Sequence, residues 1–475
     1  MPGDLLVIAL FLYSIVVIVT LVSEERDPST TLAWILILLL IPGVGIAFYL
    51  LFGRDQRAAG ARDPRRIVAA QSAARVLRPL RERFTPPDEL SADPLYARVS
   101  TAITRLNGTV PLPCDGLEIY TCGDVKFARL LADIEDARDF VHLQYFIWGS
   151  DDLTRRVCDL LAEKVREGVE VRVLYDWVGS ALHGKGQLKT LVAAGAQVRP
   201  DRADWRMLNY RNHRKVAIID GRVAYTGGMN MGEEYSDGGS RFASWRDTHI
   251  RFAGPLVGDL HALYCARWYR VTGEDLLTEA YFPLPTDPAP GVERVWAQLA
   301  FSGPESRWQV LRHVFHAAIA YATDSVRVQS PYYVPDQSIS DALSVQAVAG
   351  VDVRLMMAGV HDKRLPWWAA FSYLDELVDA CGRVFQYEAG FLHAKTLTID
   401  GRLSAVGTTN FDMRSFALHD EMQVFFYNED VTARFDAFFD EDIGQCSEVT
   451  AETLASIGRL RRFRNATARL LSRAM

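Results

Sequence analysis

The length, composition and charge of this chain exclude several classes of protein. It has 475 residues, enough for about three domains and for a core that needs no disulfide or metal to hold it together. Apolar residues make up 49% and charged residues 23%, which excludes a disordered or fibrous protein. Acidic residues outnumber basic ones, 59 to 52, and this balance argues against a general nucleic-acid binder. The 6 cysteines are scattered without a CxxC pair, so we expect reduced thiols and no zinc site.

Two uncharged apolar runs stand near the N-terminus. The first covers residues 5–22 and the second covers residues 32–52, and each is long enough to cross a bilayer core of about 30 Å. A cleaved signal peptide is disfavoured because no Lys or Arg precedes the first run. We therefore predict a transmembrane helical hairpin over residues 1–53, with two buried core helices as the alternative.

Charged residues beside these runs predict the orientation of the hairpin. The connector at residues 24–27 is net acidic, whereas arginines follow the second run in a basic juxtamembrane linker over residues 54–95. Basic residues favour the cytoplasmic side, so both termini and the rest of the chain are expected in the cytoplasm. The linker itself is either a solvated charged helix or a segment that contacts anionic lipid.

Beyond the linker, the chain reads as two copies of one unit. The strand-like run that starts at Gly168 matches the run that starts at Gly350, and each follows a helical pattern. A proline-rich linker at residues 283–291 separates a first half, residues 96–282, from a second half, residues 292–450. Because helices and strands alternate, we predict two pseudo-symmetric α/β halves with mixed, mainly parallel sheets flanked by helices.

Two further segments each allow two interpretations. Residues 364–371 place aromatic side chains, among them Trp367 and Trp368, beside an arginine, which fits either ordinary helix packing or a lid that contacts acyl chains. Residues 451–475 are predicted to form a basic amphipathic helix. That helix either docks its apolar stripe on the core or lies on an anionic membrane surface.

The strongest repeat carries side chains suited to catalysis. The motif HxKxxxxD occurs twice at an offset of 180 residues, and each copy is followed by GxxN at the same spacing. The residues are His213, Lys215, Asp220, Gly227 and Asn230 in the first copy and His393, Lys395, Asp400, Gly407 and Asn410 in the second. One such motif is weak evidence, but two copies at one offset inside a structural repeat are a specific pattern.

These residue types suit the chemistry of a phosphodiester. On a strand, a histidine and a lysine two residues apart point to the same face, so two motifs brought together form a pocket with two imidazoles and two ammonium groups. The lysines, with Asn230 and Asn410, would hold the non-bridging phosphate oxygens, so no metal and no cofactor is expected. One imidazole would attack phosphorus while the other protonates the leaving oxygen. We expect Asp220 and Asp400 to orient a histidine or to support the cationic site.

The duplicated motif resembles that of the phospholipase D superfamily. Four further segments (residues 245–249, 330–335, 390–395 and 410–415) and the hairpin are similar to bacterial cardiolipin synthases. The resemblance implies a phosphatidyltransferase that joins two phosphatidylglycerol molecules into cardiolipin and glycerol through a phosphatidyl-histidine intermediate. By analogy it implies that His213 attacks, that His393 is the acid and base, and that Glu421 supports a catalytic histidine.

The resemblance also implies a location and a set of partners. It implies a multi-pass protein of the bacterial inner membrane with a cytoplasmic catalytic region, phosphatidylglycerol and the membrane as partners, and no nucleic acid. A homodimer is compatible with the sequence. Other functions remain open: a phospholipase D hydrolase, a synthase that uses phosphatidylethanolamine as a donor, a membrane scaffold and, disfavoured by the hairpin and the acidic balance, a superfamily nuclease.

Overall fold

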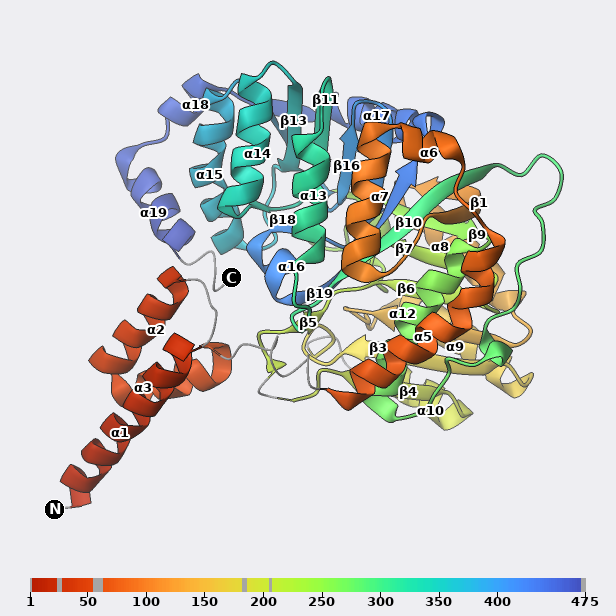
Figure 1. The fold of residues 1–475 in the computed structure, drawn as a ribbon, viewed down its shortest axis with the longest axis horizontal. Helices are drawn as coiled ribbons and strands as arrows, with labels where there is room; N and C mark the ends of the chain where they lie inside the picture. Colours follow the sequence, from red (N-terminus) through yellow and green to blue (C-terminus); the bar gives the residue numbers. More distant parts are fainter. Residues whose placement is uncertain (1, 24–27, 54–62, 182–185, 205–206, 471–475) are drawn as a thin grey trace.

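Two similar α/β halves share one continuous sheet, and a group of N-terminal helices lies at one end of the molecule (Figure 1). The computed structural model describes residues 2–23, 28–53, 63–181, 186–204 and 207–470. In the first half the strand order is β4 (Gln197–Asp201), β3 (Glu170–Asp176), β2 (Phe140–Tyr145), β6 (Val216–Ile219), β7 (Val223–Gly227), β9 (His249–Ala253) and β1 (Leu112–Tyr120). The second half repeats it as β14 (Arg383–Tyr387), β13 (Asp352–Ala358), β11 (Ser325–Gln329), β16 (Thr396–Ile399), β17 (Leu403–Gly407), β19 (His419–Tyr427) and β10 (Arg294–Ser302). Strand β10 also pairs with β1, which joins the halves, and β20 (Cys446–Val449) extends the outer edge.

The sheets are mixed, but the expectation that they are mainly parallel was wrong. Only β2, β3 and β4 run parallel in the first half, as do β11, β13 and β14 in the second, and the remaining neighbours are antiparallel. The physical reason is a tight turn, at Asp220–Gly221 in one half and Asp400–Gly401 in the other, where all four residues have φ between 52° and 63°. Two-residue turns of this conformation join antiparallel strands.

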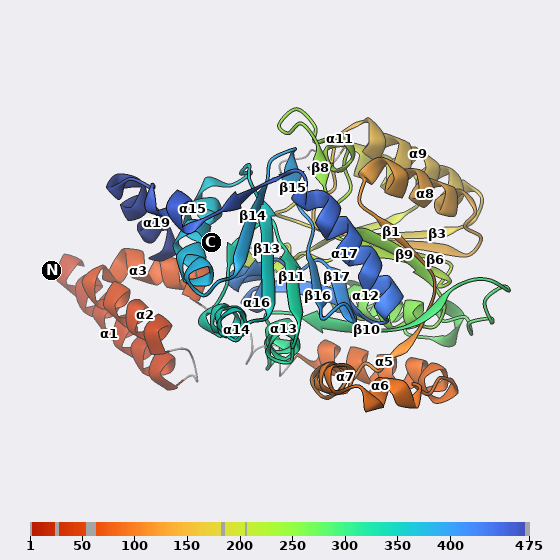
Figure 2. The same cartoon turned by 90° about the horizontal axis from the view of Figure 1, so that it is seen from above.

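Helices cover both faces of each half of the sheet. In the first half, α8 (Gly123–Glu135), α9 (Asp152–Arg166) and α10 (Gly186–Ala194) pack on one face, and α12 (Leu256–Thr272) packs on the other. In the second half, α13 (Val310–Ala320), α14 (Gln337–Val348) and α15 (Arg364–Asp379) lie opposite α17 (Glu429–Ile443), as Figure 2 shows. Strand β6 is buried on both sides, with Ala217 and Ile219 in one cluster and Val216 and Ile218 in the other. Burial on both faces explains its uninterrupted apolar run.

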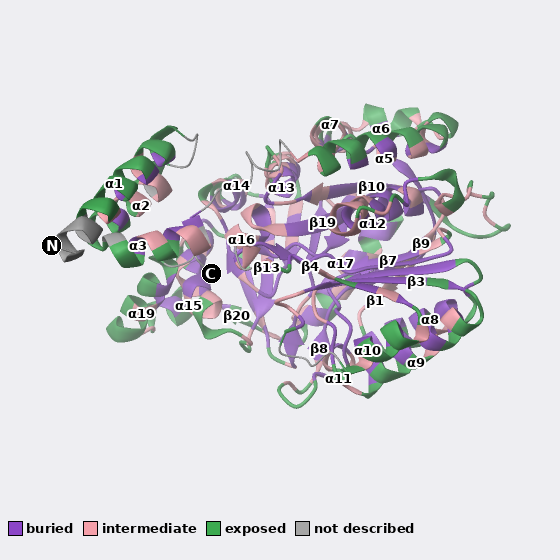
Figure 3. Ribbon diagram, turned by 90° about the horizontal axis from the view of Figure 1, so that it is seen from below, coloured by how far each residue is buried: buried purple, intermediate pink, exposed green. Residues whose placement is uncertain are grey.

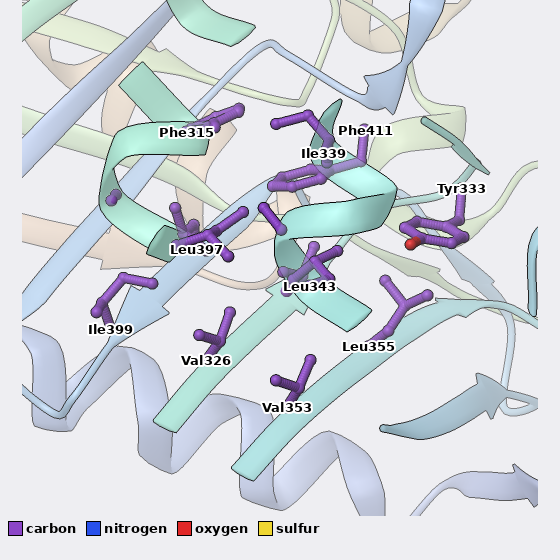
Figure 4. Close-up of a cluster of buried hydrophobic side chains, with 14 of the residues drawn as sticks. Phe315, Val326, Tyr333, Ile339, Leu343, Val353, Leu355, Leu397, Ile399 and Phe411 are labelled. Atoms are coloured by element: carbon purple, nitrogen blue, oxygen red, sulfur yellow. The ribbon is translucent and has the colours of Figure 1, made fainter. Parts of the chain in front are cut away.

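In the core of the second half, apolar side chains of neighbouring strands pack against a helix (Figure 4). Val326, Val353 and Leu397 project from adjacent strands against Ile339 and Leu343 of α14, and all five are at most 2% exposed. The predicted order of a helix followed by a buried strand is confirmed here, since α14 precedes β13. Buried residues fill the centre of the sheet in Figure 3, and exposed residues concentrate on the outer helices.

The N-terminal region forms several helices. These are α1 (Pro2–Ser23), α2 (Pro28–Leu40), α3 (Pro42–Phe48) and a π-helical turn, Tyr49–Gly53. The second apolar run is therefore divided, because Ile41 leaves the helical conformation at φ −137° and Pro42 starts a new helix. Within the described residues, no helix has both the length and the apolar character needed to cross a membrane. The acidic connector and the arginines of residues 54–62 lie outside the described residues.

The basic linker docks on the protein through helix α5 (Pro64–Arg83). Arg81 forms an ion pair with Asp259 of α12 at 3.0 Å, and Arg66 donates to the backbone oxygen of Glu305 at 2.7 Å. After α6 (Asp88–Ala92), helix α7 (Pro94–Asn107) packs in the core of the second half although it precedes the first strand of the first half. The proline-rich stretch at residues 283–291 contains no helix and no strand.

The C-terminal segment forms two helices instead of one. The first is α18 (Ala451–Ala455) and the second is α19 (Arg459–Leu470), with residues 471–475 outside the described part of the chain. Helix α19 packs on α15, in which Trp367 and Trp368 are partly buried against the core. The ordinary packing interpretation of residues 364–371 therefore agrees with the structure.

Candidate active site

Each motif histidine is positioned by a strand pairing between the halves. The short strand β5 (Arg211–Asn212) pairs with the start of β19, and the next residue, His213, donates its backbone N–H to the oxygen of Asp420 at 3.0 Å. In the same way β15 (Phe391–Leu392) pairs with β8 (Trp245–Arg246), and the His393 N–H donates to the oxygen of Arg246 at 2.7 Å. Each half therefore delivers its histidine to the other half.

A carboxylate from the opposite half holds each imidazole. Nδ1 of His213 lies 2.9 and 3.1 Å from the two carboxylate oxygens of Glu421, and Nδ1 of His393 lies 2.6 Å from Oδ2 of Asp247. Both carboxylates are fully buried. A carboxylate at Nδ1 fixes the proton there and leaves Nε2 of each ring as the nitrogen available for substrate. The structure thus brings the predicted Glu421 to His213, and it adds Asp247, for which the sequence predicted no role.

The two carboxylates occupy equivalent positions in the repeat. Gly227 pairs with His249 and Gly407 pairs with Gln423, and each carboxylate stands two residues before the paired residue. Asp247 nevertheless follows its motif glycine by 20 residues and Glu421 follows its own by 14, because the second half has a shorter connection. The offset of 180 residues that relates the two motifs therefore does not relate Asp247 to Glu421. The only indication in the sequence was that Asp247 lies inside one of the segments that carry the family resemblance.

Two buried lysines supply the positive charge of the site. Lys215 and Lys395 are 0% and 1% exposed, and each Nζ donates to the backbone oxygen of its own motif histidine. Burial lowers the pKa of Lys215 well below its ordinary value, although Glu421 raises it. Burial likewise lowers the pKa of Lys395 to about 8, with Asp247 acting in the opposite direction. Both groups therefore stand in a dry environment where an anionic ligand would interact strongly with them.

The two histidines belong to one electrostatic site, and burial lowers the pKa of both. Burial, followed by the charges of Lys215 and Lys395, lowers the pKa of His213 well below its ordinary value, and His393 lowers it further. Burial and Lys395 lower the pKa of His393 to about 4, while Asp247 raises it. Burial alone would raise the pKa of Asp247, but His393 and Lys395 hold it below the ordinary value. Both imidazoles are thus neutral at pH 7 before an anion binds.

The motif aspartates do not act at this site, so that expectation is corrected. The Asp220 carboxylate accepts backbone N–H groups of Arg138, Asp139 and Phe140 at 2.8–2.9 Å, where β2 begins. Asp400 accepts those at the start of β11 in the same way. Each aspartate follows its four-residue strand and lies about 16 Å along the chain from its motif lysine, at roughly 3.3 Å per residue. They fasten the hairpin turn to the sheet instead of orienting a histidine.

The GxxN residues allow close packing behind the histidines. A side chain at Gly227 would meet the Cα of His249 at 2.5 Å, and one at Gly407 would meet the oxygen of Met422 at 2.2 Å, so only glycine fits. Asn230 accepts the N–H of Ile147 at 3.1 Å and donates to the hydroxyl of Tyr235 at 2.8 Å. The predicted binding of phosphate by Asn230 and Asn410 stays a prediction.

Ring side chains lie beside both motif histidines. The ring centroid of Phe146 lies 5.1 Å from that of His213, and the ring centroid of Trp245 lies 5.2 Å from that of His393. His419 occupies the repeat position equivalent to Trp245 and lies 5.8 Å from His213. Sequence reasoning gave none of these three residues a role, because each comes from a segment outside the HxK motif.

Some described side chains are grouped as metal ligands could be. His213, His419 and Glu421 place three ligand atoms within 4.8 Å of one another, and His142, His261 and Cys265 do so in the core of the first half.

A separate cavity of about 1040 Å³ lies between α5 and the proline-rich linker and contains none of the motif histidines or lysines. This cavity is therefore separate from the histidine–lysine cluster.

Two pseudo-symmetric α/β halves that face each other with one histidine–lysine motif apiece define an enzyme of the phospholipase D type. A family model described as "Cardiolipin synthase, PLD-like domain" matches residues 130–238 and 315–443, and one described as "Phospholipase_D-nuclease N-terminal" matches residues 9–54. The chain is 37% identical over 465 residues to a cardiolipin synthase of Oceanobacillus iheyensis, with 94% of each chain covered. It is 35% identical over 482 residues to one of Listeria monocytogenes, with 98% of each covered. The chain belongs to the cardiolipin synthase family.

A solved structure supports the fold. Phosphatidylserine synthase of Haemophilus influenzae superimposes with a TM-score of 0.60 at 13% sequence identity, covering 79% of this chain and 100% of that one. At this level of identity the likeness concerns the arrangement of helices and strands. It confirms the two-half α/β architecture around the site.

Proposed function

We propose that this protein transfers a phosphatidyl group from one phosphatidylglycerol to another, forming cardiolipin and glycerol. The observation that carries the proposal is the pair of imidazoles, His213 and His393, each held by a carboxylate of the opposite half beside a buried lysine. Membership of the cardiolipin synthase family supports the choice of lipid.

In the first step, Nε2 of His213 attacks phosphorus of the donor lipid. When the anionic donor binds, His393 takes up a second proton, at Nε2, from solvent. A P–N bond then forms, the P–O bond to the headgroup glycerol breaks, and the leaving oxygen takes that Nε2 proton from His393. The attacking ring of His213 becomes positively charged, and the buried carboxylate of Glu421 at Nδ1 stabilises that charge. Lys215 and Lys395 hold the negative charge on the phosphoryl oxygens.

In the second step, the flow of protons reverses. His393, now neutral, accepts the proton of a glycerol hydroxyl on the second phosphatidylglycerol, and that oxygen attacks phosphorus. The P–N bond breaks and His213 returns to its neutral form. Asp247 supports the role of His393 as proton carrier because it raises the pKa of the ring, which lies at about 4 before a substrate anion adds a further increase.

The membrane location of the substrate fits the N-terminal helices. We propose that α1–α3 hold the enzyme at the membrane, because these helices expose Phe11, Val16 and Leu40 at 54%, 62% and 77%. We place the catalytic halves on the cytoplasmic side because the arginines that follow the second apolar run favour that side. Cysteine labelling of intact cells tests the orientation. A cysteine placed at Asp27 should react with an impermeant reagent and one at Asp88 should not, and the reverse pattern would contradict the proposal.

Product analysis tests the reaction itself. Purified enzyme should convert vesicles of phosphatidylglycerol alone into cardiolipin and glycerol, as resolved by mass, and a His213→Ala/His393→Ala double variant controls for contaminating enzymes. Phosphatidic acid as the main product would indicate that water is the acceptor. An absolute requirement for phosphatidylethanolamine would indicate a different donor. Either result would contradict the proposed reaction.

A further inference from the structure

Helix α19 docks on the protein through the face opposite its apolar stripe. Asn465 and Ala468 are its buried residues, at 4% and 2% exposure. Leu460, Phe463 and Leu470 are 82%, 72% and 84% exposed. These three residues are spaced by three and then seven positions, so on a helix of 3.6 residues per turn they form one stripe. The stripe lies about 150° around the helix axis from the buried face. The part of the helix that would stabilise a globular core is therefore left uncovered.

Arginine side chains fix the docked orientation. The guanidinium of Arg464 lies 4.5 Å from the ring centroid of Trp368, and that of Arg469 lies 4.4 Å from the ring centroid of Tyr373. Arg469 also donates to the backbone oxygen of Ser372 at 3.2 Å. These contacts with α15 hold the helix so that Phe463 points away from the protein.

The charge of α19 contrasts with that of the rest of the chain. The helix carries five arginines and no acidic residue, whereas the whole chain has a formal net charge of −7. An exposed apolar stripe on a purely basic helix is the pattern of a segment that lies in the interface of an anionic bilayer. Each arginine near such a surface contributes an attraction of about fivefold in affinity.

The position of α19 agrees with this pattern. Figures 1, 2 and 3 show it at the same end of the molecule as α1–α3, which expose further large apolar side chains such as Leu12 and Phe48. We propose that α19 is a second, interfacial membrane contact that inserts Leu460, Phe463 and Leu470 among the acyl chains of an anionic leaflet. This proposal rests on the proposed function only in that the lipid substrate is anionic.

The direct test measures the contact of residue 463 with lipid. The parent for this test is the full chain with Cys122, Cys381 and Cys446 changed to serine. One variant carries Phe463→Cys and the matched control carries Val125→Cys. Val125 is a suitable control because it is an apolar residue on α8 that is 58% exposed. Each cysteine carries an environment-sensitive fluorophore, and the protein is reconstituted into vesicles of phosphatidylcholine and phosphatidylglycerol that contain spin-labelled lipid. Quenching at least twofold stronger at 463 than at 125, and weaker quenching in phosphatidylcholine alone, is expected. Equal quenching at both sites would overturn the proposal. So would a blue shift at 463 without quenching by lipid, which is the result expected if a second copy of the chain or α1–α3 covered this residue.

A kinetic test separates this contact from catalysis. Phe463→Glu should lower the initial rate on phosphatidylglycerol vesicles about tenfold relative to Val125→Glu, and both variants should match the parent on short-chain lipid dispersed in detergent. Equal rates of the two variants on vesicles would overturn the proposal. If the parent made no cardiolipin in either assay, the proposed function would fail, while the labelling result would still decide the role of α19.

Discussion

Glu421→Gln should impair catalysis without changing the fold. The Glu421 carboxylate is fully buried, contacts Nδ1 of His213 at 2.9 and 3.1 Å, and also accepts the hydroxyl of Thr408. An amide keeps the size of the side chain but removes the negative charge that faces His213 when the ring becomes cationic. Hydrogen bonds to charged groups contribute about 1.5–3 kcal/mol, which corresponds to a fall in kcat of roughly 10- to 150-fold.

The assay is the initial rate of cardiolipin formation on phosphatidylglycerol vesicles, with Glu441→Gln, an exposed glutamate on α17, as the control. Because burial and the two lysines already keep the pKa of His213 well below its ordinary value, the ring is neutral at pH 7 and above. The deficit of the variant should therefore persist at every pH from 7 upward. A kcat within about threefold of the parent, or recovery at high pH, would refute the orienting role of Glu421.

Three further outcomes are expected. Asp220→Asn should lower the free energy of unfolding by about 1–3 kcal/mol, because three backbone N–H groups lose a charged acceptor, with kcat per folded molecule unchanged; a kcat defect at an unchanged Tm would contradict this. The free energy of unfolding should fall as pH drops below about 6.5, because burial holds the pKa of His261 at about 3 and that of His393 at about 4, so the unfolded chain binds more protons than the folded one. The loss is up to about 1.4 kcal/mol per histidine per pH unit. An equal Tm at pH 7.5 and pH 5.5 would contradict this. A chelator should leave kcat unchanged, because the lysines and histidines supply the charge and the proton transfer; loss of activity that magnesium or zinc restores would contradict this.

The sequence was sufficient to predict the elements that repeat at a constant spacing. His213 and His393, their lysines and the buried strands β3 and β13 all follow from the duplicated pattern, and the structure brings the two motifs together. The carboxylate Asp247 did not follow, because its connection is six residues longer than that of Glu421 (20 against 14) and because it acts across the halves. Long-range pairings such as that between β15 and β8 leave no periodic pattern in the chain.

Two other differences have local physical causes. Asp220 and Asp400 were expected at the site because they belong to the motif, but each precedes a glycine and adopts a positive φ, which is the requirement of a tight hairpin turn. That same turn made the sheets less parallel than expected. For α19, the apolar stripe predicted a helix correctly but not which face would dock, since arginine stacking on Trp368 and Tyr373 holds the opposite face against the protein.

The most direct test of the two-histidine mechanism uses a phosphatidyl ester whose leaving group is nitrophenolate. This leaving group needs no proton, so the first step no longer requires a general acid, whose help is otherwise worth roughly 10²–10⁴-fold. In a single turnover, His393→Ala should release a burst of nitrophenolate and His213→Ala should release none. A burst only from His213→Ala would exchange the roles of the two histidines, and equal bursts from both variants would contradict a covalent intermediate on His213.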